Sequence, residues 1–523
     1  MTLTIDSIPE ASHRKLPSDF VWGSATAAYQ VEGAYDEDGR TLSIWDTFSK
    51  LPERTIDGLN GDFACDQYHL YEKDFDLLQQ HGAKAYRLSL SWSRILPNGF
   101  KGTPTNQLAI AHYRRVFDAL LIRGIQPWVT LYHWDLPQCL QDEYDGFLNT
   151  ERLVEDFNYY ADVCFNEFGD QVKHWMTLNE PWTFCKLGFG LNGPHAPGRT
   201  NDRSRSEFGN PGVEVWRAGH TSLLAHAKAV ETYREKYQRE QQGVISLALN
   251  TDWFEPLTDS PKDVEAAQRR LDFMLGWFSD PLFLTGDYPA SMRKQLGDRL
   301  PRFTPEQSKS LLGSCDYYAF NHYTSQYCSD TGIETPDIND LDGNVTSSFY
   351  DVNGVLIGNK GAASWLYDCP WGFKKLLLYI KDRYNNPNVV ITENGFCVAG
   401  ESDATNAVHD VERIHYYHGY ITSLVECVAD HGCNITGYFA WSLLDNFEWA
   451  MGYTERFGIT YVNYDTQERI PKDSFKFIQN YFNLAIKPKT KKIIKRVVTR
   501  KVTLIEPGKT TVTTTVTTHT PLK

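Results

Sequence analysis

Short hydrophobic runs alternate along the chain with longer stretches in which apolar residues recur every three or four positions. The short runs are rich in Val, Ile and Leu, which is typical of strands covered on both faces, and the longer stretches have the periodicity of amphipathic helices. The pattern predicts eight strands, over residues 20–24, 85–91, 126–134, 174–180, 244–250, 315–323, 388–393 and 435–442.

Two of the intervening stretches show the helical pattern most clearly. Residues 106–124 and 151–169 each keep one face apolar, and each ends at a glycine, a common helix terminator. Strand and helix alternate in this way from Phe20 to about Ile486 with no linker between them. The sequence therefore predicts an α/β fold, a single (β/α)8 barrel (TIM barrel) rather than a doubly wound sheet.

The predicted strands end in polar and aromatic residues. In a parallel barrel all strands deliver their carboxyl ends to one rim, where barrel enzymes carry their chemistry. A functional site is therefore predicted at that rim. Its candidate residues follow the strands in chain order: Arg87, His133, Trp134, Asn179, Glu180, Asn250, Asn321, Tyr323, Glu393 and Trp441.

The composition changes after Ile486. Lys487–Lys501 is basic, and the chain from Val502 onward is mostly Thr and Val, without a core pattern. We therefore divide the sequence into a barrel, residues 1–486, and a tail, residues 487–523, which is predicted to be largely disordered. The lysine-rich part is a candidate for import-receptor binding or for contact with an anionic surface, and the Thr/Val run is a candidate for self-association.

The charge is distributed unevenly between these two parts. The formal net charge is −14, and the tail holds ten Lys or Arg and one Glu, a surplus of nine positive charges that leaves −23 on the barrel. An acidic barrel argues against nucleic-acid binding. Aromatic residues make up 14% of the chain, which suits both a large core and stacking against the apolar face of a sugar.

Ten cysteines include no Cys-x-x-Cys pair and no zinc-finger spacing, so scattered reduced thiols are predicted, with no metal and no cofactor. The N-terminal segment is too polar for a signal peptide, and no apolar run is long enough to span a membrane. We therefore expect an intracellular location, cytoplasmic by default, with nuclear import through the lysine-rich tail as the alternative.

Two glutamates stand out at the strand ends. Glu180 follows one strand-like run and precedes a proline, and Glu393 closes another run before Asn-Gly. A carboxylate at the end of a buried strand is costly unless it is paired or used. Cleavage of a glycosidic bond needs one carboxylic acid to protonate the leaving oxygen and one carboxylate at the anomeric carbon, and two glutamates in different environments can divide these roles.

The segments around both glutamates resemble a known family. Thr177–Pro181 (Thr-Leu-Asn-Glu-Pro) and Ile391–Gly395 (Ile-Thr-Glu-Asn-Gly) resemble the two catalytic motifs of glycoside hydrolase family 1, the β-glucosidases. The resemblance extends over about residues 15–486 and implies a barrel enzyme whose partner is a small-molecule β-glycoside. Further segments similar to the family's motifs are Phe20–Gly33, Tyr86–Trp92, Leu131–Pro137 and Trp441–Trp449.

The resemblance implies catalytic roles for four residues. Glu393 matches the family's nucleophile and Glu180 its acid/base, so their carboxyl groups should lie about 5–5.5 Å apart, as in retaining enzymes. Arg87 and Tyr323 are expected beside Glu393, where charge and hydrogen bonding would keep it ionised. Glu180 should carry a proton at rest and lose it when Glu393 becomes a neutral ester.

The remaining matches describe a sugar pocket. A hexose offers hydroxyl groups and one apolar face, so it needs polar ligands and an aromatic floor. The resemblance implies hydroxyl ligands, a floor, flanking rings and a leaving-group entrance; rim packing alone is the alternative for Trp134 and Phe457. The implied hydroxyl ligands are Gln30, His133, Asn179 and Glu448, the floor is Trp441, and the flanking rings are Trp449, Trp134 and Phe457. Trp365 and Asn250 belong to the leaving-group entrance, and Asn321 completes the substrate-binding set.

Single positions distinguish between the enzyme types that occur in this family. Plant-type thioglucosidases replace the acid/base glutamate, which is present here as Glu180. Phospho-glycosidases carry a phosphate cradle where this chain has Glu448-Trp449, and an anionic Glu448 would repel a 6-phosphate. The leading interpretation is a retaining β-glucosidase acting on aryl or alkyl β-glucosides or short oligosaccharides. The alternative, a catalytically silent sugar-binding protein on the same barrel, would require the loss of a catalytic glutamate.

Overall fold

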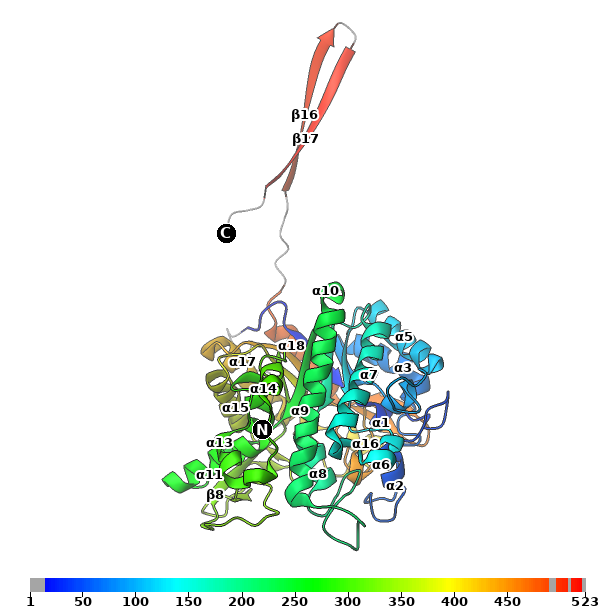
Figure 1. Ribbon diagram of the computed structural model, residues 1–523. Coiled ribbons are helices and arrows are strands. Elements are labelled where there is room, and N and C mark those ends of the chain that lie inside the picture. The colour runs from blue at the N-terminus through cyan, green and yellow to red at the C-terminus, as the bar shows by residue number, and fades with distance from the viewer. Residues whose placement is uncertain (1–14, 489–494, 507–508, 520–523) are drawn as a thin grey trace.

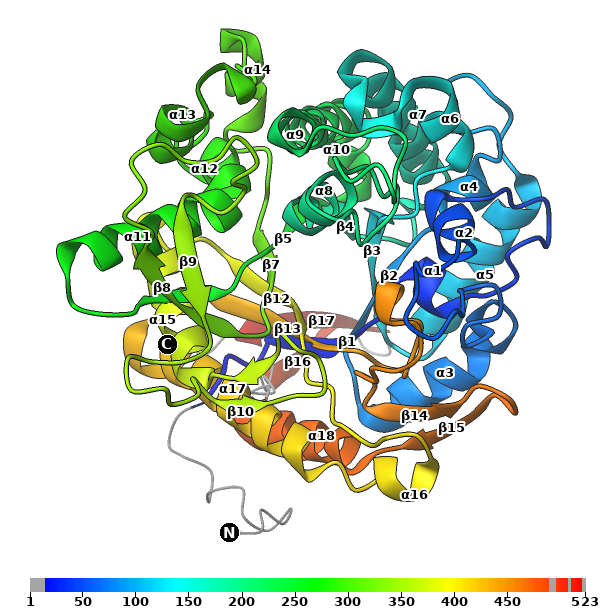
Figure 2. The same cartoon turned by 90° about the horizontal axis from the view of Figure 1, so that it is seen from below.

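The computed structural model describes residues 15–488 and the backbone of residues 495–506 and 509–519. Eight parallel strands close a barrel in the order β1-β13-β12-β7-β5-β4-β3-β2, because β1 pairs with both β2 and β13. Figure 2 shows the helices arranged around this ring. The strands are β1 (Val21–Ala25), β2 (Ala85–Ser89), β3 (Gln126–Tyr132), β4 (His174–Asn179), β5 (Val244–Asn250), β7 (Tyr318–Asn321), β12 (Val389–Asn394) and β13 (Ile435–Trp441).

All eight predicted strands are confirmed, but several are shorter than predicted. The strands β2, β3 and β7 end at Ser89, Tyr132 and Asn321, two residues before their predicted ends. The residues beyond turn into the loops of the rim, and Trp134 and Glu180 do so in the left-handed region, with φ of 73° and 45°. Residues of this kind, held in an unfavourable backbone conformation, are common at functional sites.

Helices cover the outside of the barrel, and the two predicted helices are α5 and α7, each capped by an asparagine side chain, Asn106 and Asn149. No helix in the described part of the chain combines the length and the hydrophobicity of a membrane span. The longer helices are α3 (Gln67–His81), α5 (Gln107–Ile122), α7 (Thr150–Phe168), α9 (Pro211–Lys236), α11 (Pro261–Leu271), α15 (Pro370–Arg383), α17 (Val411–His431) and α18 (Asp473–Ala485). The shorter ones are α1 (Ala28–Val31), α2 (Ile44–Ser49), α4 (Trp92–Ile95), α6 (Gln138–Tyr144), α8 (Pro181–Phe189), α10 (Gln238–Gln241), α12 (Trp277–Phe283), α13 (Ala290–Leu296), α14 (Pro305–Leu311) and α16 (Ala404–Ala407).

Small sheets are inserted after β5, β7 and β13, so their loops frame the rim at which the strands end (Figure 2). They are a three-stranded sheet of β6 (Trp253–Pro256), β8 (Ser325–Asp330) and β9 (Val345–Ser348), and two pairs, β10 (Asn359–Lys360) with β11 (Tyr367–Asp368) and β14 (Thr460–Asn463) with β15 (Glu468–Pro471).

The two ends of the barrel segment meet at the opposite rim. The N–H of Leu16 donates to the carbonyl of Ala485 at 2.9 Å, and the N–H of Lys487 donates to the carbonyl of Leu16 at 3.1 Å. Because Leu16 precedes β1, this junction lies where the strands begin. The tail therefore leaves the barrel on the side away from the strand ends.

The described part of the tail is an antiparallel hairpin of β16 (Lys495–Glu506) and β17 (Lys509–His519), in which Val502 lies opposite Val512. Figure 1 shows it extending away from the barrel. The prediction for the tail was disorder, and these two ranges differ from it. Valine and threonine favour extended backbone, and pairing satisfies their peptide groups even where no core is available.

Candidate active site

The two glutamates reach the same rim from different strands. Glu180 directly follows β4 and precedes α8, and Glu393 lies within β12. The two residues are 7% and 3% exposed, so both carboxyl groups are buried in the mouth of the barrel. The fold thus brings together two residues that are 213 positions apart in the sequence.

A continuous hydrogen-bond network joins the two carboxyl groups. Arg87 donates through Nη1 to Glu393 and through Nη2 to Oδ1 of Asn179, the latter at 2.6 Å. Asn321 donates through Nδ2 to Oδ1 of Asn179 at 3.2 Å and to Oε1 of Glu180 at 2.7 Å. The guanidinium and two side-chain amides therefore fix the positions of both carboxyl groups relative to each other.

Glu393 has the more polar surroundings. Its second oxygen accepts a hydrogen bond from the hydroxyl of Tyr323 at 2.6 Å, in addition to the ion pair with Arg87. Burial raises the pKa of Glu393, and both Arg87 and Tyr323 oppose that rise because they stabilise the ionised form. The only cation that contacts the two glutamates among the described residues is thus placed against Glu393.

Glu180 is surrounded by neutral donors. Its two oxygens accept hydrogen bonds from Asn321 and, at 2.7 Å, from the hydroxyl of Thr183. Burial and the negative charge of Glu393 raise the pKa of Glu180 to about 8. Glu180 therefore holds its proton more strongly than a free glutamate does, whereas Arg87 and Tyr323 favour the ionised form of Glu393. The sequence analysis expects the same division of protonation states, which stays a prediction.

Two neighbours refine the surroundings of Glu180. Thr183, which the sequence analysis did not single out, also accepts a hydrogen bond from Nδ2 of Asn250 at 2.9 Å. Its place three residues after Glu180, in the first turn of α8, was the available signal, since residues at this spacing face each other on a helix. The Oδ1 atom of Asn250 is buried and has no hydrogen-bond partner among the described residues.

Asn321 acts within the network and has no exposed surface. Its Nδ2 bonds to Glu180 and Asn179, and its Oδ1 accepts a hydrogen bond from Thr392 at 2.6 Å. Both ends of the amide are therefore engaged by the protein. This geometry favours a positioning role for Asn321 over the direct substrate contact that the resemblance implied.

Gln30 and Glu448 meet on one side of the mouth. The amide nitrogen Nε2 of Gln30 lies 3.0 Å from Oδ1 of Asn446, 2.9 Å from the carbonyl of Phe447 and 3.3 Å from Oε2 of Glu448. The Oε1 atom of Gln30 is buried and has no partner among the described residues. This buried acceptor is suited to a hydrogen-bond donor from a ligand, such as a sugar hydroxyl.

The pKa of Glu448 bears on the charge that the sequence analysis assigns to this residue. Burial, above all, and the neighbouring carboxyl groups of Glu455, Glu393 and Glu180 raise the pKa of Glu448 well above its usual range. The raised pKa weakens charge repulsion by an anionic Glu448 as the ground on which a 6-phosphate is disfavoured. The acidic surroundings themselves supply that ground, since a phosphate would need a cation there.

Trp441 and His133 form a pair of near-parallel rings. Their centroids are 6.0 Å apart at an interplanar angle of 17°, and both residues are 3% exposed. Nε2 of His133 lies 3.0 Å from Nδ2 of Asn179, and its Nδ1 has no partner within the described residues. Burial lowers the pKa of His133 well below its usual value, so the ring is a neutral imidazole.

Trp134 is held by the backbone of Asn179 and by the ring of Trp449. Its ring N–H donates to the carbonyl of Asn179 at 2.9 Å, and its ring lies 4.5 Å from that of Trp449. Trp449 has φ of 54°, and no hydrogen bond from its ring N–H to the described residues is formed. The arrangement thus favours the packing alternative for Trp134 and leaves the ring N–H of Trp449 available.

The outer part of the mouth is aromatic. Trp365 is 40% exposed, stacks on Phe457 with centroids 6.3 Å apart, and meets the ring of Tyr323 edge-on at 5.8 Å. Phe457 itself is buried. An exposed indole supported from behind is suited to stacking against an aromatic or sugar leaving group.

A buried ion network holds the loop that carries Glu448 and Trp449. Asp445 accepts from Arg456 at 2.9 Å, from Lys472 at 2.9 Å and from the N–H of Gly458 at 3.0 Å. Such a network is costly to form, but breaking it would leave an unpaired buried charge. It ties the loop after β13 to the start of α18.

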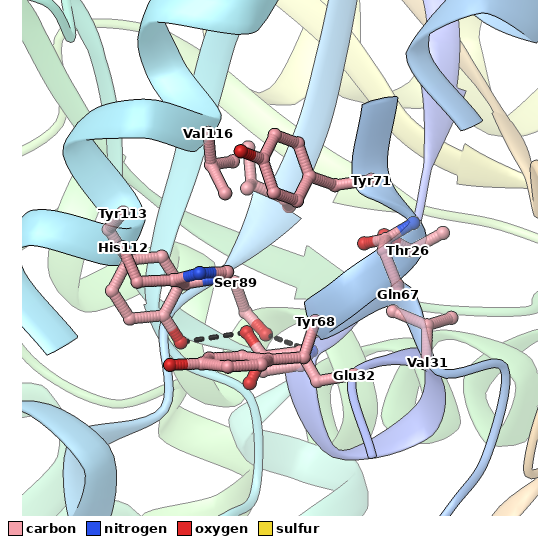
Figure 3. Close-up of a pocket in the computed structure, with 12 residues that line it drawn as sticks. Thr26, Val31, Glu32, Gln67, Tyr68, Tyr71, Ser89, His112, Tyr113 and Val116 are labelled. Carbon is pink, nitrogen blue, oxygen red and sulfur yellow. Dashed lines mark hydrogen bonds between the residues drawn. The ribbon is translucent and has the colours of Figure 1, made fainter. Parts of the chain in front are cut away.

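A second polar cluster supports the segment that carries Gln30 (Figure 3). Tyr113 donates to Oε1 of Glu32 at 2.7 Å, Arg94 donates to Oε2 of the same residue at 3.2 Å, and Ser89 accepts from the N–H of Ala28 at 2.7 Å. Figure 3 shows His112 and Tyr68 beside these groups. The cluster anchors both sides of α1, so the position of Gln30 is set by contacts to β2, α4 and α5.

The described residues contain no group of three or more His, Cys, Asp or Glu side chains placed to hold a metal ion.

Comparison with known proteins agrees with this geometry over the whole barrel. Residues 12–485 match the family described as glycosyl hydrolase family 1. The chain belongs to glycosyl hydrolase family 1. The match includes every strand and helix of the barrel.

Individual members of family 1 are similar to the chain over most of its length. Beta-glucosidase 1B of Phanerodontia chrysosporium is 50% identical over 487 residues, which are 92% of this chain and 89% of that protein. Beta-glucosidase 12 of Oryza sativa subsp. indica is 46% identical over 483 residues, 90% of this chain and 93% of that protein. A family 1 beta-glucosidase from the fungus Humicola insolens, solved in complex with glucose, superimposes with a TM-score of 0.89 at 45% identity, covering 91% of this chain and all of that one.

A further solved structure bears on the reaction. A mutant of the rice beta-glucosidase Os3BGlu6, in a covalent complex with glucose, is 45% identical with a TM-score of 0.86, over 90% of this chain and 98% of that chain. These comparisons favour an active glycosidase, and none favours the catalytically silent alternative.

Proposed function

We propose that this protein is a retaining β-glucosidase that removes terminal β-D-glucosyl residues from aryl or alkyl glucosides and short oligosaccharides. The observation that carries the proposal is the bridged pair of carboxyl groups, with Arg87 against Glu393 and, among the described residues, the neutral donors Asn321 and Thr183 against Glu180. A retaining mechanism needs one charged and one protonated carboxyl group, about 5–5.5 Å apart, and that spacing stays our expectation for this pair.

In the first step, the carboxylate of Glu393 attacks the anomeric carbon while Glu180 gives its proton to the glycosidic oxygen. The bond between the anomeric carbon and that oxygen breaks, the leaving group departs as an alcohol, and the sugar becomes an ester of Glu393. Esterification removes the charge that helps to raise the pKa of Glu180. Glu180 is then a base, which takes a proton from the water that hydrolyses the ester.

Sugar recognition is assigned to the groups that the protein leaves without partners. Oε1 of Gln30, Nδ1 of His133 and the carboxylic acid of Glu448 are proposed to bind hydroxyl groups, with Trp441 as the floor. Asn179 is proposed to bond the 2-hydroxyl, where a contact strengthens as the transition state forms. Trp449 adds its ring N–H.

The leaving group is proposed to lie against Trp365, between Phe457 and the entrance near Asn250. An aromatic platform of this kind accepts aryl groups and sugars alike. We therefore place the reaction in carbohydrate metabolism, with the short β-glucosides of cellulose degradation among its candidate substrates.

The test is the stereochemistry of the reaction. Purified protein is given 4-nitrophenyl β-D-glucoside, and the first glucose formed is followed by proton NMR. The β anomer should appear first and mutarotate later. The α anomer appearing first would indicate inversion and exclude Glu393 as a covalent nucleophile, and an inert protein would exclude the activity itself.

A second proposal concerns the tail, and its specific observation is the hairpin of β16 and β17. A two-stranded sheet leaves one unpaired edge on each strand, which is a template for pairing with another copy. We propose self-association through these edges, with import-receptor binding by the lysine-rich part and a cytoplasmic or nuclear location as secondary expectations.

Full-length protein and a chain ending at Ile486 provide the matched pair for this proposal. Light scattering should give a larger mass for the full-length protein, and imaging of both as fusions should show whether the distribution in the cell changes. Equal masses would refute self-association, and equal distributions would refute import.

A further inference from the structure

Two cysteines face each other across the turn between α17 and β13. Cys427 lies in the last turns of α17, and Cys433 follows Gly432, which ends the helix with φ of 65°. The carbonyl of Cys427 accepts hydrogen bonds from the N–H of Gly432 and, at 3.0 Å, from the N–H of Cys433. A glycine in this conformation reverses the chain and brings the side chains on either side of it together.

The thiol of Cys427 donates to the carbonyl of Lys374 at 3.9 Å, and its side chain interacts with that of Cys433. All ten cysteines are free thiols. Cys427 has no exposed surface and Cys433 is 5% exposed, but Gly432 and Asn434 beside it are exposed. A small oxidant therefore reaches Cys433 first.

The charges around the two cysteines also favour reaction at Cys433 before Cys427. The hydrogen bond from Cys427 and the charge of Lys381 lower the pKa of Cys433, against burial and Asp382. The hydrogen bond with Cys433 and burial raise the pKa of Cys427. The thiolate, which is the nucleophilic form, is thus favoured on the sulfur nearer to solvent.

We propose that Cys427 and Cys433 form a modification site that hydrogen peroxide closes to a disulfide. The thiolate of Cys433 attacks one peroxide oxygen, the O–O bond breaks, and sulfenic acid and one water result. The sulfur of Cys427 then attacks the sulfenic sulfur and releases a second water. Two thiols and one peroxide thus give one disulfide and two waters, and a dithiol reductant reverses the change.

The disulfide is expected to change the thermal stability of the protein and not its catalytic activity. The turn lies where β13 begins, at the rim opposite Glu180 and Glu393, so the disulfide ties α17 to β13 without touching the site. We expect unchanged hydrolysis of β-glucosides and a melting temperature raised by about 2 °C, because a short loop is closed in a large domain.

The experiment treats the full-length protein with a small excess of hydrogen peroxide. Intact mass should fall by about 2 Da, titratable thiols should fall from ten to eight, and peptide mapping should link Cys427 to Cys433. Cys139→Ser, which changes a half-buried thiol elsewhere, should show the same mass change and link. Cys433→Ser should lose both, as well as the rise in melting temperature.

Cys427→Ser separates the two steps. Without the resolving thiol, sulfenic acid should remain on Cys433, where dimedone labels it. Sulfinic acid on Cys433 in the unsubstituted protein without a link, or oxidation of other cysteines while this pair stays reduced, would overturn the proposal. So would an equal loss of thiols in Cys433→Ser.

Discussion

The two halves of the active site contain the same side chain in opposite surroundings. Glu393 lies against the guanidinium of Arg87 and the hydroxyl of Tyr323, whereas the carboxyl group of Glu180 accepts hydrogen bonds from the amide of Asn321 and the hydroxyl of Thr183. Both are buried, so burial alone would protonate both. A cation placed on one side favours the ionised form there and so separates the pKa values of two chemically identical residues.

The largest effect is expected from removing the charged half. Glu393→Ala abolishes covalent attack, so kcat for 4-nitrophenyl β-D-glucoside should fall roughly 10⁵- to 10⁶-fold, as when a catalytic nucleophile is deleted elsewhere. Glu334→Ala, at an exposed glutamate, is the control and should keep full activity. Retention of a few per cent of kcat in Glu393→Ala would contradict the assignment.

Removing the neutral half should produce a loss that depends on the leaving group. Glu180→Ala eliminates the proton donor, so alkyl glucosides should lose roughly 10²- to 10⁴-fold in kcat/KM, the usual range for a general acid. A 2,4-dinitrophenyl glucoside needs no protonation and should lose far less. Equal losses on both substrates would show that Glu180 is not the acid.

The cation that distinguishes the two halves can be replaced. In Arg87→Met, the pKa of Glu393 should rise, and the acid limb of the kcat/KM profile should move up by roughly 1–3 pH units, the size of an opposite-charge interaction. Tyr323→Phe removes one hydrogen bond and no charge, so its shift should be smaller. An acid limb that stays in place in both variants would mean that Glu393 does not set it.

The basic limb reports on Glu180. The active form carries the proton, so kcat/KM should be maintained below the pKa of Glu180, about 8, and lost as the pH rises through it. The hydroxyl of Thr183 stabilises the ionised form, so Thr183→Val should move this limb to higher pH by less than about one unit.

Thr183→Ser keeps the hydroxyl and is the matched control for that shift. Its profile should coincide with that of the unsubstituted protein. A shift of the basic limb to lower pH in Thr183→Val would reverse the sign of the hydrogen bond and count against the proposed protonation state.

The barrel was predictable from the sequence because its signals are local. The buried run ending at Glu393 and the apolar face of residues 151–169 each indicate one element without knowledge of the others. The strand ends were less predictable, since Trp134 and Glu180 leave their strands with positive φ only in the context of the rim. Pattern fixes the type of an element more firmly than its last residue.

The sequence predicted which residues form the site more reliably than which atoms their side chains bond to. Residue type and order indicated Asn321 and Trp134, but which atoms their side chains bond to depends on strands far apart in the sequence. The raised pKa of Glu448 is a similar case, because it arises from three other acids brought near by the fold. Thr183 lacked a motif and had only its helical spacing.

The contact between Leu16 and Ile486 has a practical consequence. The polypeptide enters and leaves the barrel at neighbouring positions on the rim where the strands begin. A carrier attached at either position would therefore leave the active-site mouth accessible to solvent. The same closeness means that a short linker would join the two positions, so that a circular permutant with new termini in a surface loop is expected to keep the barrel intact.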